Sequence, residues 1–177
     1  RKFNAQVKKI FISFGGADPR NFTLKTLKSI SQLNETFQIN ISIGLFFSKK
    51  QITTLEKFSD SNNLNAKFLF DIDLLRDHFY WSDFSIIGSG LTKYEMLATG
   101  TPGISISLNG SDYESNGIIS NMKAIVNLRY DISIKNLSKK ISKLARNCRL
   151  RSELSTNARS LVDGRGLHRV TNAIEKL

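Results

Sequence analysis

Short apolar runs alternate along the chain with longer segments in which apolar residues recur every three or four positions. Short runs bounded by glycine, asparagine, serine or aspartate are typical of buried strands, and the longer spacing is typical of amphipathic helices. We predict strands at residues 8–14, 37–43, 66–70, 84–87, 103–108 and 124–128. We predict helices at 23–33, 51–59, 74–81, 92–99, 113–122, 134–148, 150–162 and 167–177. Strands and helices therefore alternate until the last three elements, which are all helical.

This order of elements predicts the fold class. Strands that are apolar on both faces and separated by helices form parallel sheets covered by helices on both sides. Right-handed crossovers then give an α/β, Rossmann-like sheet of about six strands. The 177 residues suit one domain, and no repeat, low-complexity tract or proline-rich linker divides them. We predict a single domain over residues 1–177.

The net charge of +11, from 26 basic and 15 acidic residues, adds a question about partners. A basic chain can have a solvated surface or bind an anionic small ligand, nucleic acid or an acidic membrane. Residues 1–29 carry +6, residues 129–177 carry +8 and the middle carries −3. The basic stretch at 135–151 is a membrane-surface candidate, because Lys139, Lys140, Lys143 and Arg146 can face outward together. The alternative is the solvated outer face of a helix packed on the core. No basic stretch is interleaved with aromatics as in RNA-binding signatures, so nucleic acid is not favoured.

Cysteine and histidine are scarce. Cys148 has no second cysteine to pair with, which fits a reducing cytoplasm. His78 and His168 form no zinc-ligand spacing with it, and we expect neither a metal nor a cofactor. The apolar runs are far shorter than the ~18 residues that a membrane-spanning helix needs.

Three loops follow predicted strands, where ligands of such sheets bind. The first contains Gly15, Gly16 and Asp18. Two adjacent glycines allow a phosphate or sugar to approach the backbone, and Asp18 can accept hydrogen bonds from hydroxyls. The alternative is that the glycines serve only a tight turn.

The second loop has the sequence Gly88-Ser89-Gly90-Leu91-Thr92 and precedes a helix that carries Glu95. Its N–H groups and hydroxyls suit a diphosphate, although a plain glycine turn explains the spacing equally well. The dinucleotide fingerprint GxGxxG is excluded because Lys93 stands at its third glycine. Glu95 either stabilises the helix dipole or binds the two hydroxyls of a ribose.

The third loop, residues 108–116, is rich in hydrogen-bonding groups. Ser111 or Asp112 accounts for the helix N-cap. Asn109 and Asn116 are in excess of capping, and with Ser115 they are candidates for contact with a sugar.

The runs FGGADPRNFTLK at 14–25, SDFSIIGSGLTKYEMLATGTPGISI at 82–106 and LVDGRGLHRV at 161–170 resemble the C-terminal half of the GT-B fold. Within that fold they are most similar to the UDP-sugar hydrolase of pseudaminic acid biosynthesis and its spore-coat polysaccharide relatives, and more distantly to MurG. The likeness covers nearly the whole chain in the same order.

The resemblance implies a UDP-sugar site that faces a missing N-terminal domain of the same chain. It assigns Gly88, Ser89, Gly90, Leu91 and Thr92 to the diphosphate, Glu95 to the ribose, and the backbone near Phe70 and Ile72 to uracil. Gly15, Gly16 and Asp18 would line the interdomain cleft. Asn109 matches an asparagine that contacts the reacting sugar in the hydrolase, but Gly110 stands where a glutamine is expected. Leu91 likewise departs from the Gly-Gly-Ser loop of many relatives.

The chemistry implied by the resemblance is attack of water at the anomeric region of the sugar with loss of UDP, with a general base from the missing domain. We expect the UDP-binding half of a UDP-sugar hydrolase in nonulosonic-acid or cell-surface polysaccharide biosynthesis. A glycosyltransferase of the same architecture is the first alternative. A non-enzymatic basic module for RNA or a membrane surface is the second.

Overall fold

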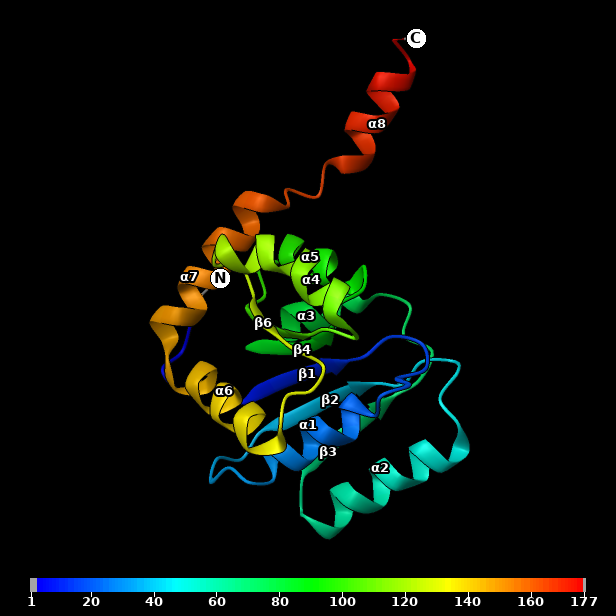
Figure 1. Ribbon diagram of the computed structural model, residues 1–177, viewed down its shortest axis with the longest axis vertical. Coiled ribbons are helices and arrows are strands. Elements are labelled where there is room, and N and C mark those ends of the chain that lie inside the picture. Colours follow the sequence, from blue (N-terminus) through cyan, green and yellow to red (C-terminus); the bar gives the residue numbers. More distant parts are fainter. Residues whose placement is uncertain (1–2, 177) are drawn as a thin grey trace.

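The computed structural model describes residues 3–176, and within this range six strands and eight helices alternate as the hydrophobic pattern predicts (Figure 1). The strands are β1 (Lys9–Ser13), β2 (Gln38–Ser42), β3 (Asn65–Leu69), β4 (Phe84–Gly88), β5 (Gly103–Ile106) and β6 (Val126–Leu128). The helices are α1 (Phe22–Ile30), α2 (Lys49–Ser61), α3 (Leu75–Trp81), α4 (Thr92–Ala98), α5 (Gly110–Asn121), α6 (Ile134–Arg146), α7 (Cys148–Leu161) and α8 (Gly166–Ile174).

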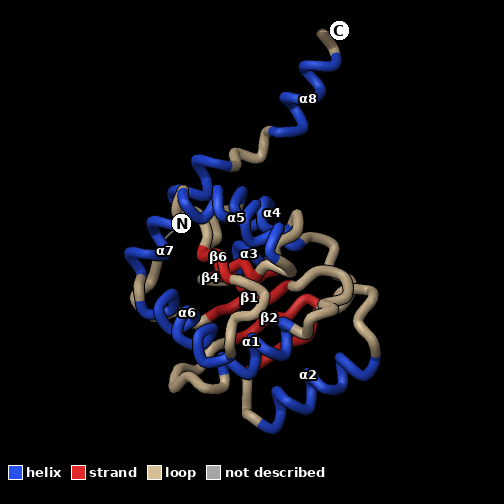
Figure 2. Tube along the Cα trace, viewed as in Figure 1, coloured by secondary structure: helices blue, strands red, loops and turns tan. Residues whose placement is uncertain are grey.

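The strands form one sheet in the order β3-β2-β1-β4-β5-β6, and every neighbouring pair is parallel. β1 lies at the centre, where Ile12 is level with Ile41 of β2 and Ile86 of β4. Figure 2 shows the sheet enclosed by helices. The predicted Rossmann-like α/β fold is therefore confirmed, and the chain reverses its direction of travel across the sheet between β1 and β4.

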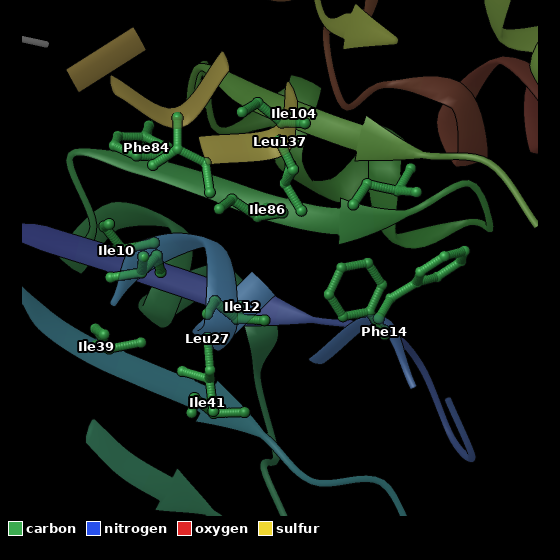
Figure 3. Close-up of a cluster of buried hydrophobic side chains, with 14 of the residues drawn as sticks. Ile10, Ile12, Phe14, Leu27, Ile39, Ile41, Phe84, Ile86, Ile104 and Leu137 are labelled. Carbon is green, nitrogen blue, oxygen red and sulfur yellow. The ribbon is translucent and has the colours of Figure 1, made fainter. Parts of the chain in front are cut away.

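Each face of the sheet has its own hydrophobic core, because successive side chains of a strand point to opposite faces. On one face Ile10 and Ile12 of β1 pack with Leu27 of α1 and Leu137 of α6 (Figure 3). On the other face Phe11 packs in a cluster that includes residues of α3 and α4. The two cores together hold all six strands in register and align their carboxyl ends.

The helix boundaries follow local capping. Ser48 and Gln51 form a capping box, so α2 begins two residues before its predicted start. Asn109 caps α5, which begins at Gly110 rather than at the predicted Tyr113. The last predicted helix begins one residue early, and its predicted end, residue 177, lies outside the described residues.

The basic helix α6 is amphipathic in the predicted sense. Leu137, Ile141 and Leu144 are buried, whereas Lys139, Lys140 and Lys143 are exposed. α8 differs from the other helices because it has no buried residue and projects from the body of the molecule (Figure 1). No helix among residues 3–176 combines the length and apolar character needed to cross a membrane.

Candidate functional site

A pocket of about 410 Å³ lies at the carboxyl edge of the sheet. Its walls come from the segments that follow β1, β2 and β3 and from the start of α4. The lining residues are Ser13, Gly15, Gly16, Ser42, Ile43, Gly44, Leu45, Asp71, Ile72, Asp73, Leu75 and Thr92. Parallel α/β sheets bind their ligands at this edge. The pocket brings together four residues that the sequence singles out: Gly15, Gly16, Ile72 and Thr92.

A second cavity of about 450 Å³ opens at the opposite edge, among residues such as Val7, Phe37 and Arg146. It contains none of the predicted site residues. A further cavity of about 300 Å³ is lined by one of them, Asp18. The carboxyl-edge pocket gathers four of them and is therefore the candidate site.

Three glycines shape one wall of the pocket. A Cβ atom on Gly44 would lie 2.5 Å from both the carbonyl oxygen of Gly15 and the Cα of Gly16. The N–H of Phe46 also donates to the carbonyl oxygen of Gly16 at 2.9 Å. The β1–α1 and β2–α2 loops thus touch through their backbones. Sequence reasoning missed Gly44, although a glycine immediately after a predicted strand was an available signal.

Asp18 does not line this pocket. Its carboxylate accepts hydrogen bonds from the N–H of Phe22 at 2.8 Å and of Thr23 at 2.7 Å, and the residue is only 2% exposed. Burial raises the pKa of Asp18, and the hydrogen bonds from Thr23 and Phe22 oppose that rise. The carboxylate thus accepts from N–H groups that have no partner within the helix at the start of α1. The expected contact of Asp18 with ligand hydroxyls stays a prediction.

Asn21 is the N-cap of α1 by position. Its backbone is left-handed, with φ of 52°, and its side chain makes no capping hydrogen bond. Asp18 does the capping from outside the helix. Capping by Asp18 instead of Asn21 depends on the conformation of the turn, which the spacing of residues along the sequence does not predict.

The β4–α4 loop lies beside the pocket, and Thr92 is the member that lines it. Ser89 is buried, and its hydroxyl donates to Asp112 Oδ2 at 2.9 Å. Gly90 and Leu91 are exposed. Within residues 3–176, the N–H groups of Gly90, Leu91 and Thr92 donate no hydrogen bond. The loop therefore has unpaired N–H groups that a ligand could use.

Glu95 lies one turn after Thr92 on α4 and is exposed. Residues three apart share a face of a helix, so its carboxylate lies on the same side as the pocket-lining Thr92. Phe70, the other residue expected near uracil, is 51% exposed and immediately precedes pocket residue Asp71. The roles expected for Glu95 and Phe70 stay predictions.

The third loop differs from its expected arrangement. Asn109 Oδ1 accepts from the N–H of Asp112 at 2.9 Å, so Asn109 is the N-cap rather than Ser111 or Asp112. Asn116 is fully buried, and its Oδ1 accepts from Lys93 Nζ at 2.6 Å. Asn116 is therefore unable to contact a sugar in this conformation. Asn109 and Ser115 are exposed, and their predicted contact with a sugar stays a prediction.

Lys93 is the residue of this region that sequence reasoning missed. It is 9% exposed, and its ammonium group donates to the carbonyl oxygen of Ser89 at 3.0 Å as well as to Asn116. Burial lowers the pKa of Lys93, and the charge of Asp112 opposes that shift. The only signal in the sequence was its position, where a basic residue interrupts the glycine pattern.

The two histidines lie apart from the pocket lining. His78 stacks on Phe11 of β1 with ring centroids 5.3 Å apart, and burial lowers its pKa. His168 is exposed on α8. Among the described residues no three His, Cys, Asp or Glu side chains form a group that could hold a metal ion.

Comparisons with known proteins bear on the fold. No protein-family model matches the chain. The uncharacterized protein MJ1062 of Methanocaldococcus jannaschii is 32% identical over 104 residues, which make up 58% of this chain and 21% of that protein.

Solved structures match along more of the chain. MurG of Acinetobacter baumannii matches 100% of it with a TM-score of 0.82 and 17% identity, over 54% of its own length. WaaG, a glycosyltransferase involved in lipopolysaccharide biosynthesis, matches 90% with a TM-score of 0.74 and 14% identity, over 44% of its length. HepE of Anabaena, in complex with UDP-glucose, matches 96% with a TM-score of 0.72 and 11% identity, over 49% of its length.

The chain thus spans about half the length of these solved structures. Identities below one fifth show the fold and nothing finer. The chain has the fold of the C-terminal half of a GT-B glycosyltransferase.

Proposed function

We propose that this chain is the UDP-sugar-binding half of a glycosyltransferase of the GT-B architecture. The observation that carries the proposal is the pocket at the carboxyl edge of the sheet, in a fold that matches 96% of its length to a structure holding UDP-glucose. Transfer is favoured over the hydrolysis expected from the sequence because WaaG, a structure of the same fold, is described as a glycosyltransferase. Hydrolysis remains the competing reaction at the same site.

The residues suit a nucleoside diphosphate in distinct ways. Unpaired N–H groups of Gly90, Leu91 and Thr92 can donate to phosphate oxygens without a basic side chain at the surface. The carboxylate of Glu95 can accept from two adjacent ribose hydroxyls. Ile72 and Phe70 supply apolar surface for a base.

In this mechanism the chain binds the nucleotide and favours its departure. Negative charge accumulates on the diphosphate as the bond to the sugar breaks. Fixed N–H donors stabilise such developing charge, often by a few kcal/mol. The pocket has two carboxylates, Asp71 and Asp73, and both belong to the segment after β3 that is expected to bind uracil. We therefore propose that a second domain supplies the general base.

A glutamate substitution tests this function. Glu95→Ala should weaken UDP binding by roughly 1–3 kcal/mol through loss of charge-assisted hydrogen bonds to the ribose. Isothermal titration calorimetry with UDP measures the loss. Glu56→Ala is the matched control, because Glu56 is exposed on α2 and should leave the affinity unchanged. A folded wild-type chain that does not bind UDP would overturn the proposal.

We further propose that a second domain covers the carboxyl edge. Leu45, Phe46 and Leu91 are 77–83% exposed there, and α8 exposes Leu167, Val170 and Ile174 on one face. Exposed apolar side chains of this kind mark interaction surfaces. Their burial should slow amide hydrogen exchange in the β2–α2 loop, which carries Leu45 and Phe46, and in α8 when a longer protein that contains this chain is compared with the chain alone. Equal exchange in the two would contradict the proposal.

A further inference from the structure

Lys93 is a buried cation that forms no ion pair among the described residues, although its pKa, which burial lowers, is partly restored by the charge of Asp112. It is 9% exposed, and no carboxylate among residues 3–176 lies within ion-pair distance of its ammonium group. Buried lysines are normally paired with a carboxylate, because removing a charge from water is unfavourable. The position of Lys93 therefore needs an explanation beyond packing.

The contacts of Lys93 connect two parts of the fold. Its ammonium donates to the main-chain oxygen of Ser89 in the β4–α4 loop and to Asn116 Oδ1 in α5. The Ser89 hydroxyl is held in turn by Asp112 at the start of α5. Ser89 is thus fixed through both its backbone and its side chain. Lys93 and Asp112 together fasten the loop to α5.

The side-chain amide of Asn116 points its oxygen toward Lys93. Asn116 is fully buried, and its Nδ2 has no hydrogen-bond partner. An unpaired buried N–H is unfavourable. The amide nevertheless directs its oxygen to Lys93, since a protonated amine can only donate. Asn116 thus acts as an acceptor for Lys93 although its own N–H groups stay unpaired.

The charge of Lys93 lies directly behind a loop whose N–H groups have no partner. The carbonyl oxygen of Ser89, the nearest acceptor in that loop, is occupied by Lys93. The following residues Gly90, Leu91 and Thr92 keep their N–H groups unpaired within the described chain. The charge behind the loop and the unpaired N–H groups on its outer side both favour binding of an anion over a neutral group.

We propose that Lys93 is a positioning residue for the diphosphate of the nucleotide. It holds Ser89 so that the β4–α4 loop presents its N–H groups to the phosphates, and its charge adds to their attraction. This inference rests on the proposed UDP site. It differs from the role of Glu95, which concerns the ribose.

The test compares a ligand that has phosphates with one that lacks them. Lys93→Met should weaken UDP binding by about tenfold, because the loop loses both the hydrogen bond that holds Ser89 and the positive charge behind it. Binding of uridine should stay within about twofold, because uridine has no phosphate for the loop to bind. Ligand-observed NMR on the purified chain measures both affinities. Lys93→Arg, which keeps the charge and the donors, should recover part of the UDP affinity.

The outcomes separate the two proposals. A wild-type chain that binds neither ligand would overturn the proposed function. If the wild type binds UDP and Lys93→Met binds it equally well, the role of Lys93 is wrong and the function stands. Equal loss of UDP and uridine in folded Lys93→Met would also contradict the inference, since it indicates a general structural role.

If Lys93→Met does not fold, a second variant provides the same test. Lys93→Gln keeps a hydrogen-bond donor without the charge, and circular dichroism would first confirm that it is folded. It should show the same selective loss of UDP affinity. A folded Lys93→Gln that binds UDP as tightly as the wild type would overturn the role of the charge.

Discussion

The β1–α1 and β4–α4 loops look alike in sequence but are held in different ways. Both follow central strands, both contain glycine, and both lie at the carboxyl edge of the sheet. The first loop is fixed by its own helix, because Asp18 caps α1 from within the turn. The second is fixed by a neighbouring helix, through Asp112 of α5 and through Lys93, which reaches Asn116 of α5.

This difference bears on which loop can bind a ligand. The carboxylate of the first loop is already used, and its glycines contact Gly44 and Phe46 of the next loop. The second loop keeps unpaired N–H groups because its anchors attach to the Ser89 hydroxyl and carbonyl oxygen. A polar loop is therefore a candidate binding element only after its internal hydrogen bonds are known.

Among the substitutions that test this comparison, Gly44→Ala should change the free energy of unfolding most. Its Cβ would lie 2.5 Å from the Gly15 carbonyl oxygen and the Gly16 Cα, so the two loops must separate. We expect a loss of about 2–3 kcal/mol in the free energy of unfolding, as for overpacked sites. Urea denaturation followed by circular dichroism measures it.

Gly90→Ala is the matched control in the second loop. No atom lies within 4 Å of the Cβ that it would add, and Gly90 has no positive φ. Its stability should stay within about 0.5 kcal/mol of the wild type. Equal stabilities of the Gly44 and Gly90 variants would show that the first loop is not tightly packed.

A smaller effect is expected from Asp18→Ala. Loss of a helix cap lowers the free energy of unfolding by about 1–2 kcal/mol. Asp18→Asn should lose less, because an amide oxygen still accepts one hydrogen bond and asparagine tolerates the positive φ of 41° found here. Denaturant midpoints compare the two variants. An Asp18→Ala variant with wild-type stability but weakened UDP binding would restore the ligand-binding role and break the contrast between the loops.

Particular residues show how much of the fold and of the candidate site the sequence predicts. All six strands and eight helices were predicted within a few residues, because buried apolar runs and helical periodicity are local patterns. The amphipathic face of α6 followed from the same periodicity. In the candidate site, Gly15, Gly16, Ile72 and Thr92 were predicted and do line one pocket. Their grouping follows from the alignment of strand ends in a parallel sheet.

The sequence did not predict the burial of three polar residues, Asp18, Asn116 and Lys93. Each is a polar residue in a polar loop or an amphipathic helix, so its spacing resembles that of a surface group. Each is buried by an element distant along the chain or by the closure of its own turn. Hydrogen-bond partners such as Lys93 and Asn116 are 23 residues apart, and no local pattern relates them.

The sequence by itself therefore determined the alternation of strands and helices, the α/β class and the loops at the ligand-binding edge, because these depend on short-range hydrophobic periodicity and chain order. The strand order β3-β2-β1-β4-β5-β6, the contact of Gly44 with Gly15 and Gly16, and the burial of Lys93 were decided only by the tertiary structure. Burial and hydrogen bonding between distant segments depend on how helices pack on the sheet. That packing determines which polar groups are used internally and which are left for a ligand.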